Sequence, residues 1–250
     1  MLALEVALLS DRGGRDYNED ACGHWHSERH LCCVLADGAG GHGGGDIASR
    51  LAVQEMVSRF SSQPTGDGDA LAQALRQTND ALLGQRVPGT PRQDMHSTAV
   101  CLVIDFVDHS AHWAHAGDSR LYWLRGGRVL QRTRDHSLVQ ALVDAGVLTE
   151  AQMQAHPKRS ELRSALGLAP DQLVVTGGDG AGPVQAGDVF MLCTDGLWEY
   201  LGDEVLERTL AGAGTPRAWL DALAAEVAAA THDKASHDNY TALVVWTRDA

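Results

Sequence analysis

The stretch Val34-Leu35-Ala36-Asp37-Gly38-Ala39-Gly40-Gly41-His42-Gly43-Gly44-Gly45-Asp46 sets the interpretation of the whole sequence. The apolar run 31–36 leads directly into Asp37, and six of the eight residues at positions 38–45 are glycine. Glycine lets the backbone turn with positive φ and lets a ligand approach closely. A carboxylate at a strand end, with the Gly38 carbonyl beside it, suits a hard divalent cation that prefers oxygen ligands. An ordinary glycine-rich turn with a capping aspartate explains this stretch equally well, so the decision depends on acidic residues elsewhere in the chain.

The composition indicates a globular, acidic protein. The chain has 250 residues, within the range of one large domain, and 44% of them are hydrophobic, which is enough for a core. The formal net charge of -13 argues against nucleic acid or an anionic membrane surface as the main partner. The same charge would repel a phosphate substrate unless bound cations offset it. We therefore predict one domain over residues 1–250 with no nucleic acid and no membrane partner.

The cysteines and the N-terminus favour a cytoplasmic location. The cysteines are odd in number and lack the CxxC spacing of metal sites, which predicts buried free thiols in a reducing compartment. They are Cys22, Cys32, Cys33, Cys101 and Cys193. Glu5 interrupts the apolar N-terminal residues and no basic region precedes them, so we predict a first strand and not a signal peptide. No apolar run approaches the length needed to span a bilayer.

Hydrophobic periodicity divides the chain into many short strands and two separate pairs of helices. The predicted strands cover residues 2–10, 21–26, 31–36, 98–107, 110–116, 121–124, 128–132, 173–176, 188–193 and 242–246. The predicted helix pairs cover 47–60 with 70–83, and 203–210 with 216–230; Asp46 is expected to cap the first helix. Two shorter helices, 136–146 and 149–156, fall in a polar, proline-interrupted segment that we interpret as a flap-like insertion at about 134–163.

This order of elements predicts an α+β fold. Strands joined by short turns pair antiparallel, so the sheets should be mostly antiparallel. Two sheets packed face to face, each with a helix pair on its outer face, would bury the observed apolar pattern. The expected architecture is a four-layer α-β-β-α sandwich.

Acidic residues recur at the predicted strand ends and turns. They are Glu19 with Asp20, Asp37, Asp118, Asp195 and Asp238. If these strand ends converge, several ionised carboxylates share a small site, which requires cations between them. The set has no thiolate and no obligatory histidine, which favours Mg or Mn over Zn. Two such ions are the usual arrangement for phosphoester hydrolysis by an activated water. For Asp118, a simple role in a hairpin turn is an equal alternative.

Six motifs then occur in order along the chain. They are Arg15-x-x-Asn18-Glu19-Asp20, Ala36-Asp37-Gly38-x-Gly40-Gly41-His42, Gly117-Asp118-Ser119-Arg120, Asp135-His136-Ser137, Thr194-Asp195-Gly196-Leu197 and Asp238-Asn239-Tyr240-Thr241. Each motif is weak alone, but six in order at domain-wide spacing are specific. The sequence resembles bacterial members of the metal-dependent serine/threonine protein phosphatases, the PPM or protein phosphatase 2C family, over nearly all of its length. The family's β-sandwich flanked by helix pairs agrees with the architecture expected from the pattern.

The resemblance also implies roles for individual residues. Asp37 would bridge two metal ions, with the Gly38 carbonyl and Glu19 on one ion and Asp195 and Asp238 on the other. Asp20 would hold metal-bound water. Asp118, together with Asp195, would hold the third ion found in bacterial relatives. Arg15 would bind the substrate phosphate, because a guanidinium fork matches two phosphate oxygens.

One position departs from the family pattern. Many eukaryotic relatives have a histidine directly after the Asp-Gly, where it is proposed to protonate the leaving group, and this chain has Ala39. His42 is the nearest substitute, so it is the candidate general acid; a purely structural role in the glycine-rich loop is its alternative.

The implied activity is metal-dependent hydrolysis of phosphoserine and phosphothreonine in proteins, opposing a serine/threonine kinase. A hydrolase of small phosphoesters and a non-catalytic phosphoprotein-binding module are the alternatives, and the presence of Asp37, Asp195 and Asp238 argues against the second. We expect a monomer whose partners are phosphoprotein substrates and the opposing kinase.

Overall fold

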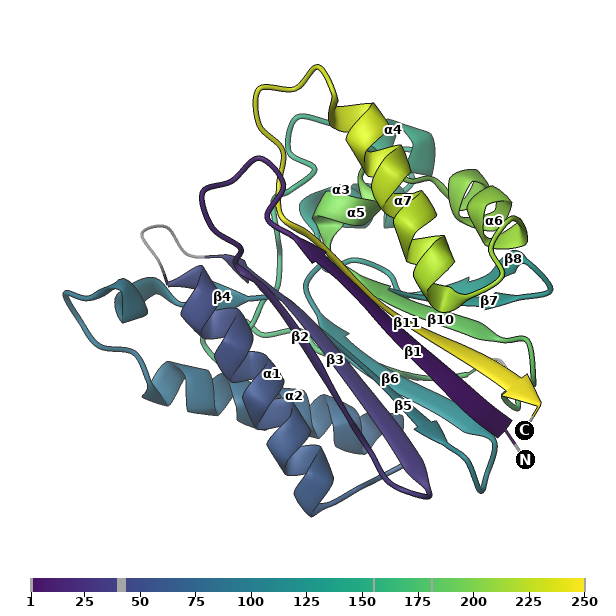
Figure 1. Ribbon diagram of the computed structural model, residues 1–250. Helices are drawn as coiled ribbons and strands as arrows, with labels where there is room; N and C mark the ends of the chain where they lie inside the picture. The colour runs from purple at the N-terminus through teal and green to yellow at the C-terminus, as the bar shows by residue number, and fades with distance from the viewer. Residues whose placement is uncertain (1, 40–43, 155, 181, 250) are drawn as a thin grey trace.

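The computed structural model describes residues 2–39, 44–154, 156–180 and 182–249, and its centre is a pair of antiparallel sheets (Figure 1). One sheet has the order β1 (Leu2–Asp11), β11 (Tyr240–Asp249), β10 (Val189–Cys193), β7 (Arg120–Arg125) and β8 (Arg128–Arg132). The other has the order β2 (Asp20–His26), β3 (His30–Ala39), β5 (Ala99–Asp105), β6 (Ser110–Ala116) and β9 (Thr176–Asp179), with β4 (His96–Ser97) paired to β3.

A helix pair covers the outer face of each sheet (Figure 1). Helices α1 (Gly45–Ser62) and α2 (Gly68–Gly84) pack on the sheet that contains β3, and α6 (Asp203–Ala211) and α7 (Pro216–Thr231) pack on the sheet that contains β10. The remaining helical segments are α3 (Leu138–Asp144), α4 (Glu150–Gln154), α5 (Asp195–Trp198) and the 3-10 turn η1 (Pro91–Asp94). The predicted four-layer α-β-β-α sandwich and its α+β class are confirmed.

Strand β3 shows why this sequence forms layers. Successive strand side chains point to opposite faces, so Cys33 and Leu35 pack between the two sheets, while Cys32 and Val34 pack beneath α1 and α2. All four side chains are fully buried. Because β3 is covered on both faces, it reads as a continuous apolar run and not as an alternating one. The end of this run is the point at which Asp37 is delivered.

The prediction of a strand at 173–176 is wrong, because a serine side chain bonds the backbone of this segment. Leu173 and Val175 are buried as the alternation requires. However, the Ser164 hydroxyl occupies both backbone groups of Val174, accepting from its N–H at 2.8 Å and donating to its C=O at 2.9 Å. Those groups are therefore not available for a sheet ladder. Strand β9 begins only at Thr176, opposite His115.

The expected cap at Asp46 is also wrong. Helix α1 begins at Gly45, with Gly44 as its N-cap, so Asp46 lies within the first turn. There its carboxylate accepts from Arg50 Nη2 at 2.5 Å, one turn further along the helix. An acidic side chain in the first turn still interacts favourably with the helix dipole. The short helix α5 was not predicted, since the sequence 194–197 was interpreted only as the end of a strand.

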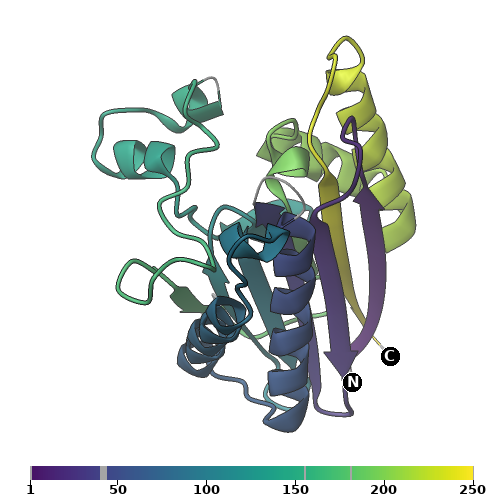
Figure 2. The ribbon, with the colours of Figure 1, turned by 90° about the vertical axis from the view of Figure 1, so that its left-hand side faces the viewer.

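The segment 134–163 carries its two helices away from both sheets (Figure 2). It contains α3 and α4, which are shorter than the helices predicted at 136–146 and 149–156. The Ser137 hydroxyl caps α3 by accepting from the Gln140 N–H. Beyond the end of α3, Gly146 adopts a φ of +70°, a conformation that glycine tolerates without strain. We refer to residues 134–163 as the flap segment.

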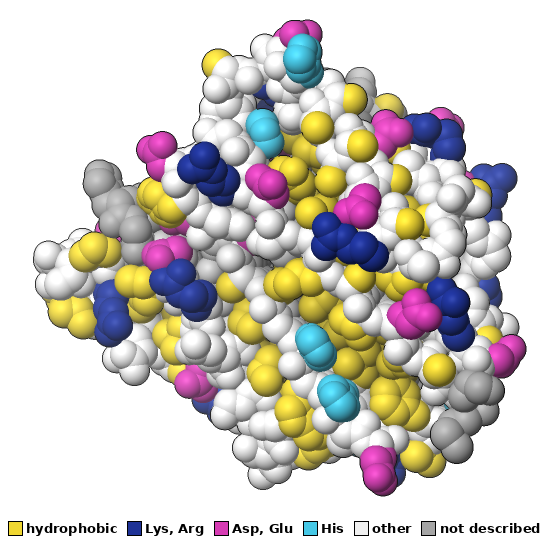
Figure 3. All heavy atoms as spheres, in the orientation of Figure 1, with side chains coloured by type: hydrophobic (Ala, Val, Ile, Leu, Met, Phe, Trp, Pro, Cys, Tyr) yellow, Lys and Arg dark blue, Asp and Glu magenta, His cyan; other side chains and the backbone are white. Residues whose placement is uncertain are grey.

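The two sheets leave an open apolar seam on the side where their edge strands β1 and β2 face solvent. A cavity of about 400 Å³ lies there, and its walls include Leu2, Leu4 and Val6 of β1 and His24 and His26 of β2. Hydrophobic side chains gather on this face of the molecule (Figure 3).

The prediction that the cysteines are buried free thiols is confirmed for four of them, and the fifth is only half-buried. Cys32, Cys33, Cys101 and Cys193 are buried free thiols, and Cys22 is half-buried and also free. Within the part of the chain that the structure describes, no helix combines the length and the apolar character needed to cross a bilayer.

Candidate metal centre

The predicted acidic residues converge at one end of the sandwich. Asp20 begins β2 and Asp37 lies near the end of β3, where the two residues are directly paired across the strands. Two like charges directly opposite each other in a sheet are destabilising unless a counter-ion lies between them. The register that places them together is fixed by the apolar residues of both strands, since a slip of one residue would turn every side chain to the other face.

Three further aspartates approach this pair from other strand ends. Asp118 follows β6, Asp195 follows β10 as the first residue of α5, and Asp238 lies two residues before β11. The charges of Asp195, Asp118 and Asp238 all act on the Asp37 carboxyl. Residues separated by more than 200 positions in the chain therefore form one site.

This convergence raises the pKa of several carboxyl groups. Burial, followed by the negative charges of the other aspartates, raises the pKa of Asp37 well above its usual range. Burial and the charges of Glu199 and Asp238 raise the pKa of Asp195 to about 7, against a hydrogen bond from Asp37 that acts in the opposite direction. A hydrogen bond between two carboxyl groups requires one of them to carry a proton. The centre therefore favours a bound proton or a bound cation over several free charges.

The pKa values of Asp20 and Asp118 are raised for the same reasons. Burial raises the pKa of Asp20 to about 7, although hydrogen bonds with Thr241 and Thr194 stabilise its charged form. Burial and the charge of Asp195 raise the pKa of Asp118 well above its usual range. Perturbed carboxyl groups gathered at one point mark a functional site more often than a structural one.

The donor set fits a hard divalent cation. Three oxygens of the centre are buried and have no hydrogen-bond partner: Glu19 Oε1, Asp20 Oδ1 and Asp195 Oδ1. Buried polar atoms without partners are rare in folded proteins, and a bound ion is one way in which such atoms are satisfied. Among the described residues, no three His, Cys, Asp or Glu side chains are placed closely enough to hold a metal ion as they stand. The unpartnered oxygens nevertheless are carboxylate oxygens, the donors that Mg and Mn prefer.

The Gly38 backbone comes within reach of Glu19 because glycine occupies two positions. A Cβ on Gly38 would lie 2.1 Å from the Gly45 carbonyl oxygen, and a Cβ on Gly45 would lie 2.4 Å from Glu19 Oε1. The Gly38 N–H also donates to the Glu19 carbonyl at 3.1 Å. The predicted proximity of Asp37, Gly38 and Glu19 is thus present, and any side chain at positions 38 or 45 would close it.

Asn239 is a positioning residue that the sequence motif did not identify as such. It is 5% exposed, and its side chain makes three hydrogen bonds: Oδ1 accepts from Glu19 N at 2.8 Å, and Nδ2 donates to the carbonyls of Arg12 at 2.8 Å and Tyr17 at 3.0 Å. A single amide therefore attaches the turn that carries Arg15 and Glu19 to the last strand. In the sequence, the only sign of this role was that Asn239 directly follows Asp238 in the motif.

Thr194 is the second such residue. Its hydroxyl donates to Asp20 Oδ2 at 3.0 Å and accepts from the Thr241 N–H at 3.0 Å. Because Thr194 is fully buried, this hydroxyl holds Asp20 at a fixed distance from the strand that leads to Asp195. Nothing in the spacing of the sequence predicts the contact, since Thr194 and Asp20 are 174 positions apart.

Arg15 lies at the centre as predicted and pairs with one of its acids. Its Nη2 donates to Asp238 Oδ2 at 2.8 Å, and both side chains are about half exposed. An exposed ion pair contributes little to stability, so the guanidinium can leave Asp238 for another anion at small cost. His42 lies outside the described residues, and Ala39 is an exposed residue at the end of β3.

The chain matches known proteins over most of its length. The family model described as Protein phosphatase 2C matches residues 10–235. The chain is 35% identical over 211 residues to the serine/threonine protein phosphatase PstP of Mycobacterium tuberculosis, which covers 84% of this chain and 39% of PstP. It is 33% identical over 215 residues to the protein phosphatase PhpP of Streptococcus pneumoniae, which covers 81% of this chain and 82% of PhpP. The chain thus spans about two fifths of the length of PstP.

Solved structures share the fold over the full chain. The catalytic domain of PstP, in complex with two manganese ions, superposes with a TM-score of 0.79 at 30% identity and covers 100% of both chains. The serine/threonine phosphatase of S. agalactiae superposes with a TM-score of 0.82 at 26% identity and covers 98% of this chain and 99% of that one.

Proposed function

The chain belongs to the protein phosphatase 2C family, and from that premise we propose that it hydrolyses phosphoserine and phosphothreonine in proteins with the help of bound Mn or Mg. The observation that supports this most strongly is the set of buried, unpartnered carboxylate oxygens at one end of the sandwich. Such a set is stable as a charged group only with cations, and a phosphoryl substrate needs the same cations to approach a chain of charge -13.

We assign the ligands as the sequence implies. Asp37, Glu19 and the Gly38 carbonyl would hold one ion, Asp37 would also contribute with Asp195 and Asp238 to the other, and Asp20 would hold water at the ions. Asp118 with Asp195 offers a third position. When bound, the ions activate a water for attack on phosphorus and offset the charge that develops there.

The protein's own residues supply orientation and binding. Thr194 and Asn239 hold Asp20 and the Glu19 turn, so the ligands are preorganised by buried hydrogen bonds. Arg15 exchanges its Asp238 contact for two phosphate oxygens of the substrate. His42 is retained as the candidate proton donor to the serine or threonine oxygen, because Ala39 has no proton to donate.

The wider assignments follow from the same premise. We propose one phosphatase domain over residues 1–250 in which the flap segment contacts the protein substrate. We also propose a monomer that opposes a serine/threonine kinase in the cytoplasm; the five free thiols support a reducing compartment.

The test compares substrates with and without metal. Phosphoserine and phosphothreonine peptides, a nucleotide and para-nitrophenyl phosphate are each assayed in Mn, in Mg and in excess chelator. The expected result is hydrolysis of the peptides at the highest kcat/KM, lost in chelator and restored by Mn or Mg. Full activity in chelator would reject metal dependence. A nucleotide preferred over every peptide would favour the small-phosphoester alternative, and metal binding without turnover of any substrate would favour a binding module.

A narrower test addresses His42. If it is the general acid, His42→Ala should lower kcat on a phosphothreonine peptide on the order of 10²-fold and much less on para-nitrophenyl phosphate, whose leaving group needs no proton. An equal fall on both substrates would remove His42 from that role.

A further inference from the structure

The turn that carries Asp118 is held from several sides by residues outside the ligand set. On the side of Asp37, Thr98 Oγ1 accepts from the Asp37 N–H at 3.0 Å and shares a hydrogen bond of 2.7 Å with Ser119 Oγ. Gly117, which precedes Asp118, has a φ of +103°, and a Cβ there would lie 2.6 Å from the Thr98 side chain. The turn is therefore pressed against the strand end that delivers Asp37.

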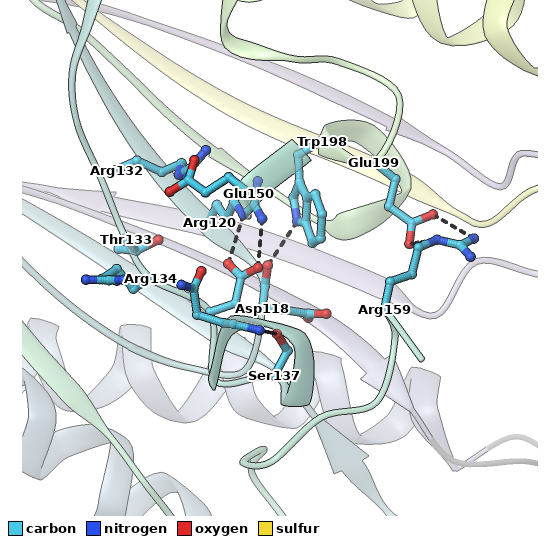
Figure 4. A network of polar contacts seen from close by, with 12 residues as sticks. Asp118, Arg120, Arg132, Thr133, Arg134, Ser137, Glu150, Arg159, Trp198 and Glu199 are labelled. Carbon is cyan, nitrogen blue, oxygen red and sulfur yellow. Dashed lines mark hydrogen bonds and ion pairs between the residues drawn. The ribbon is translucent and has the colours of Figure 1, made fainter. Parts of the chain in front are cut away.

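Trp198 holds the same turn from the direction of Asp195. Its Nε1 donates to the backbone carbonyl of Asp118 at 2.9 Å, and both residues are buried (Figure 4). Trp198 is the last residue of the single-turn helix α5, whose first residue is Asp195. One hydrogen bond thus connects the backbone of Asp118 to the element that presents Asp195, the residue with which it would share an ion.

A buried ion pair fixes the position of the indole. The Arg120 guanidinium carbon lies 3.5 Å from the centroid of the Trp198 ring. The same guanidinium donates to both carboxylate oxygens of Asp135, at 2.8 and 2.7 Å, and to the Tyr122 hydroxyl at 3.1 Å. Three hydrogen bonds therefore hold the Arg120 guanidinium in place, and its contact with the ring restrains the indole.

His136 holds the turn from the flap segment. Its backbone N–H donates to the Gly117 carbonyl at 2.9 Å, and its Nδ1 accepts from the Gly117 N–H at 3.2 Å. The ring stacks on His115 with centroids 4.5 Å apart, and its Nε2 is 2.9 Å from Thr176 Oγ1. Both backbone groups of Gly117 are therefore bonded to one residue at the base of the flap segment.

We propose that Trp198 and His136 are positioning residues that orient the Asp118 carboxylate toward Asp195 and so create a third metal position beside the two-ion centre. This inference rests on the proposed function for the identity of the two core ions. It adds that the third position depends on residues that contact no ion, and that one of these residues belongs to the flap segment.

The test measures Mn binding directly by calorimetry on the full chain, without substrate. Trp198→Phe removes the Nε1 donor but keeps an aromatic ring beneath Arg120. Trp219→Phe is the matched control. Trp219 lies in α7 away from the centre and is also buried, and its replacement removes one hydrogen bond, from Nε1 to Thr209 Oγ1 at 3.0 Å. Asp118→Asn defines which ion belongs to the third position. His136→Ala removes the Nδ1 acceptor, and His136→Asn restores an acceptor at nearly the same place.

The expected result is a third-ion Kd about tenfold weaker in Trp198→Phe and in His136→Ala, with the two core ions changed less than about twofold. Trp219→Phe should leave all three ions unchanged, and His136→Asn should recover most of the third-ion affinity. Equal behaviour of Trp198→Phe and Trp219→Phe would overturn the proposal. So would a wild-type chain that binds two ions and no Asp118-dependent third, although the proposed function would then stand. Failure of the wild type to bind the core ions would contradict the proposed function itself.

Discussion

Asp135 is a buried carboxylate and Asp195 a half-buried one at the end of the same sandwich, and they differ in what they face. Asp135 accepts two hydrogen bonds from the guanidinium of Arg120, at 2.8 and 2.7 Å, and the pair is almost entirely buried. Asp195 meets the carboxyl group of Asp37 and the charges of Asp20, Asp238 and Glu199, and one of its oxygens has no partner. Among the described residues, Arg120 pairs with the first carboxylate and no cationic side chain pairs with the second.

The comparison separates a structural acid from a functional one. Where the chain provides its own arginine, the charge is satisfied within the fold and serves to hold elements together, as with Asp188 and Arg125 at 2.6 Å. Where it provides only further acids, the site keeps an affinity for an external cation. Burial alone does not distinguish the two cases, because Asp135 and Asp118 are equally inaccessible.

The largest expected effect is on catalysis at the unpaired carboxylates. Asp195→Asn should lower kcat by about 10³-fold or more on a phosphopeptide, because it weakens an ion worth several kcal/mol to the transition state. Asp37→Asn and Asp238→Asn should act in the same direction. Initial rates at saturating Mn measure the effect.

The same substitution should spare the fold, and this is the control. In excess chelator, the melting temperature of Asp195→Asn should equal or exceed that of the wild type, since the change removes a buried charge that has no cation. A variant that loses activity only in proportion to its loss of folded protein would contradict the assignment of Asp195 to the metal centre.

The next effect is on stability at the paired carboxylate. Asp135→Asn leaves the Arg120 guanidinium buried without its counter-ion and should lower the free energy of unfolding by about 3–5 kcal/mol. Denaturant titration in chelator measures this value. The double variant Asp135→Leu with Arg120→Met should recover much of the loss, because replacing both members of a buried pair by apolar residues is often neutral. If Asp135→Asn were as stable as Asp195→Asn, the distinction between the two carboxylates would be wrong.

A smaller effect is expected at Arg15, on the exposed edge of the centre. Arg15→Ala should raise KM about tenfold and change kcat by less than about threefold, because a phosphate contact present in both the bound substrate and the transition state affects mainly binding. Stability should hardly change, since the Arg15–Asp238 pair is exposed. Arg15→Lys should recover only part of the affinity, as an ammonium lacks the planar fork. An unchanged KM with a collapsed kcat would make Arg15 a transition-state group instead.

The smallest effect is a pH dependence that sharpens the same comparison. Burial and neighbouring charges raise the pKa of Asp195 in the folded chain to about 7, above its ordinary value of 3.8. Between pH 7 and about 4 the folded state therefore holds a proton on Asp195 that the unfolded state releases, so this group makes the metal-free wild type more stable as pH falls through that range. The stability advantage of Asp195→Asn in chelator should accordingly be greatest at pH 8 and shrink by pH 5.

Thermal melts of the two proteins at each pH measure this difference. Comparing the variant with the wild type removes the contributions of groups on which Asp195 does not act, such as His136, whose pKa is lowered to about 3 by burial and the charges of His115 and Arg163. An advantage that stays constant from pH 8 to 5 would show that Asp195 is not protonated in the metal-free fold. In saturating Mn the wild type should be the more stable protein at pH 8.

The pattern of residues along the chain was enough to predict the layers and the identity of the acids. The apolar run 31–36 and the helical spacing at 47–60 report local geometry, because side-chain periodicity depends only on near neighbours in sequence. The acids lie at predicted strand ends and turns, which raised the hypothesis that they converge, and the structure brings Asp20, Asp37 and Asp195 together. The strand predicted at 173–176 failed because a serine side chain took the backbone bonds that a neighbouring strand would have used.

Only the tertiary structure decided which acids are paired and what holds them. Arg120 could have faced any carboxylate, and its choice of Asp135 rather than Asp118 separates the structural acid from the functional one. The contacts of Asn239 with Glu19 and of Thr194 with Asp20 join residues 220 and 174 positions apart. Such contacts depend on how the layers pack in three dimensions, and no periodicity in the chain encodes them. The acids themselves were visible because they stand at the strand ends and turns that the apolar pattern marks.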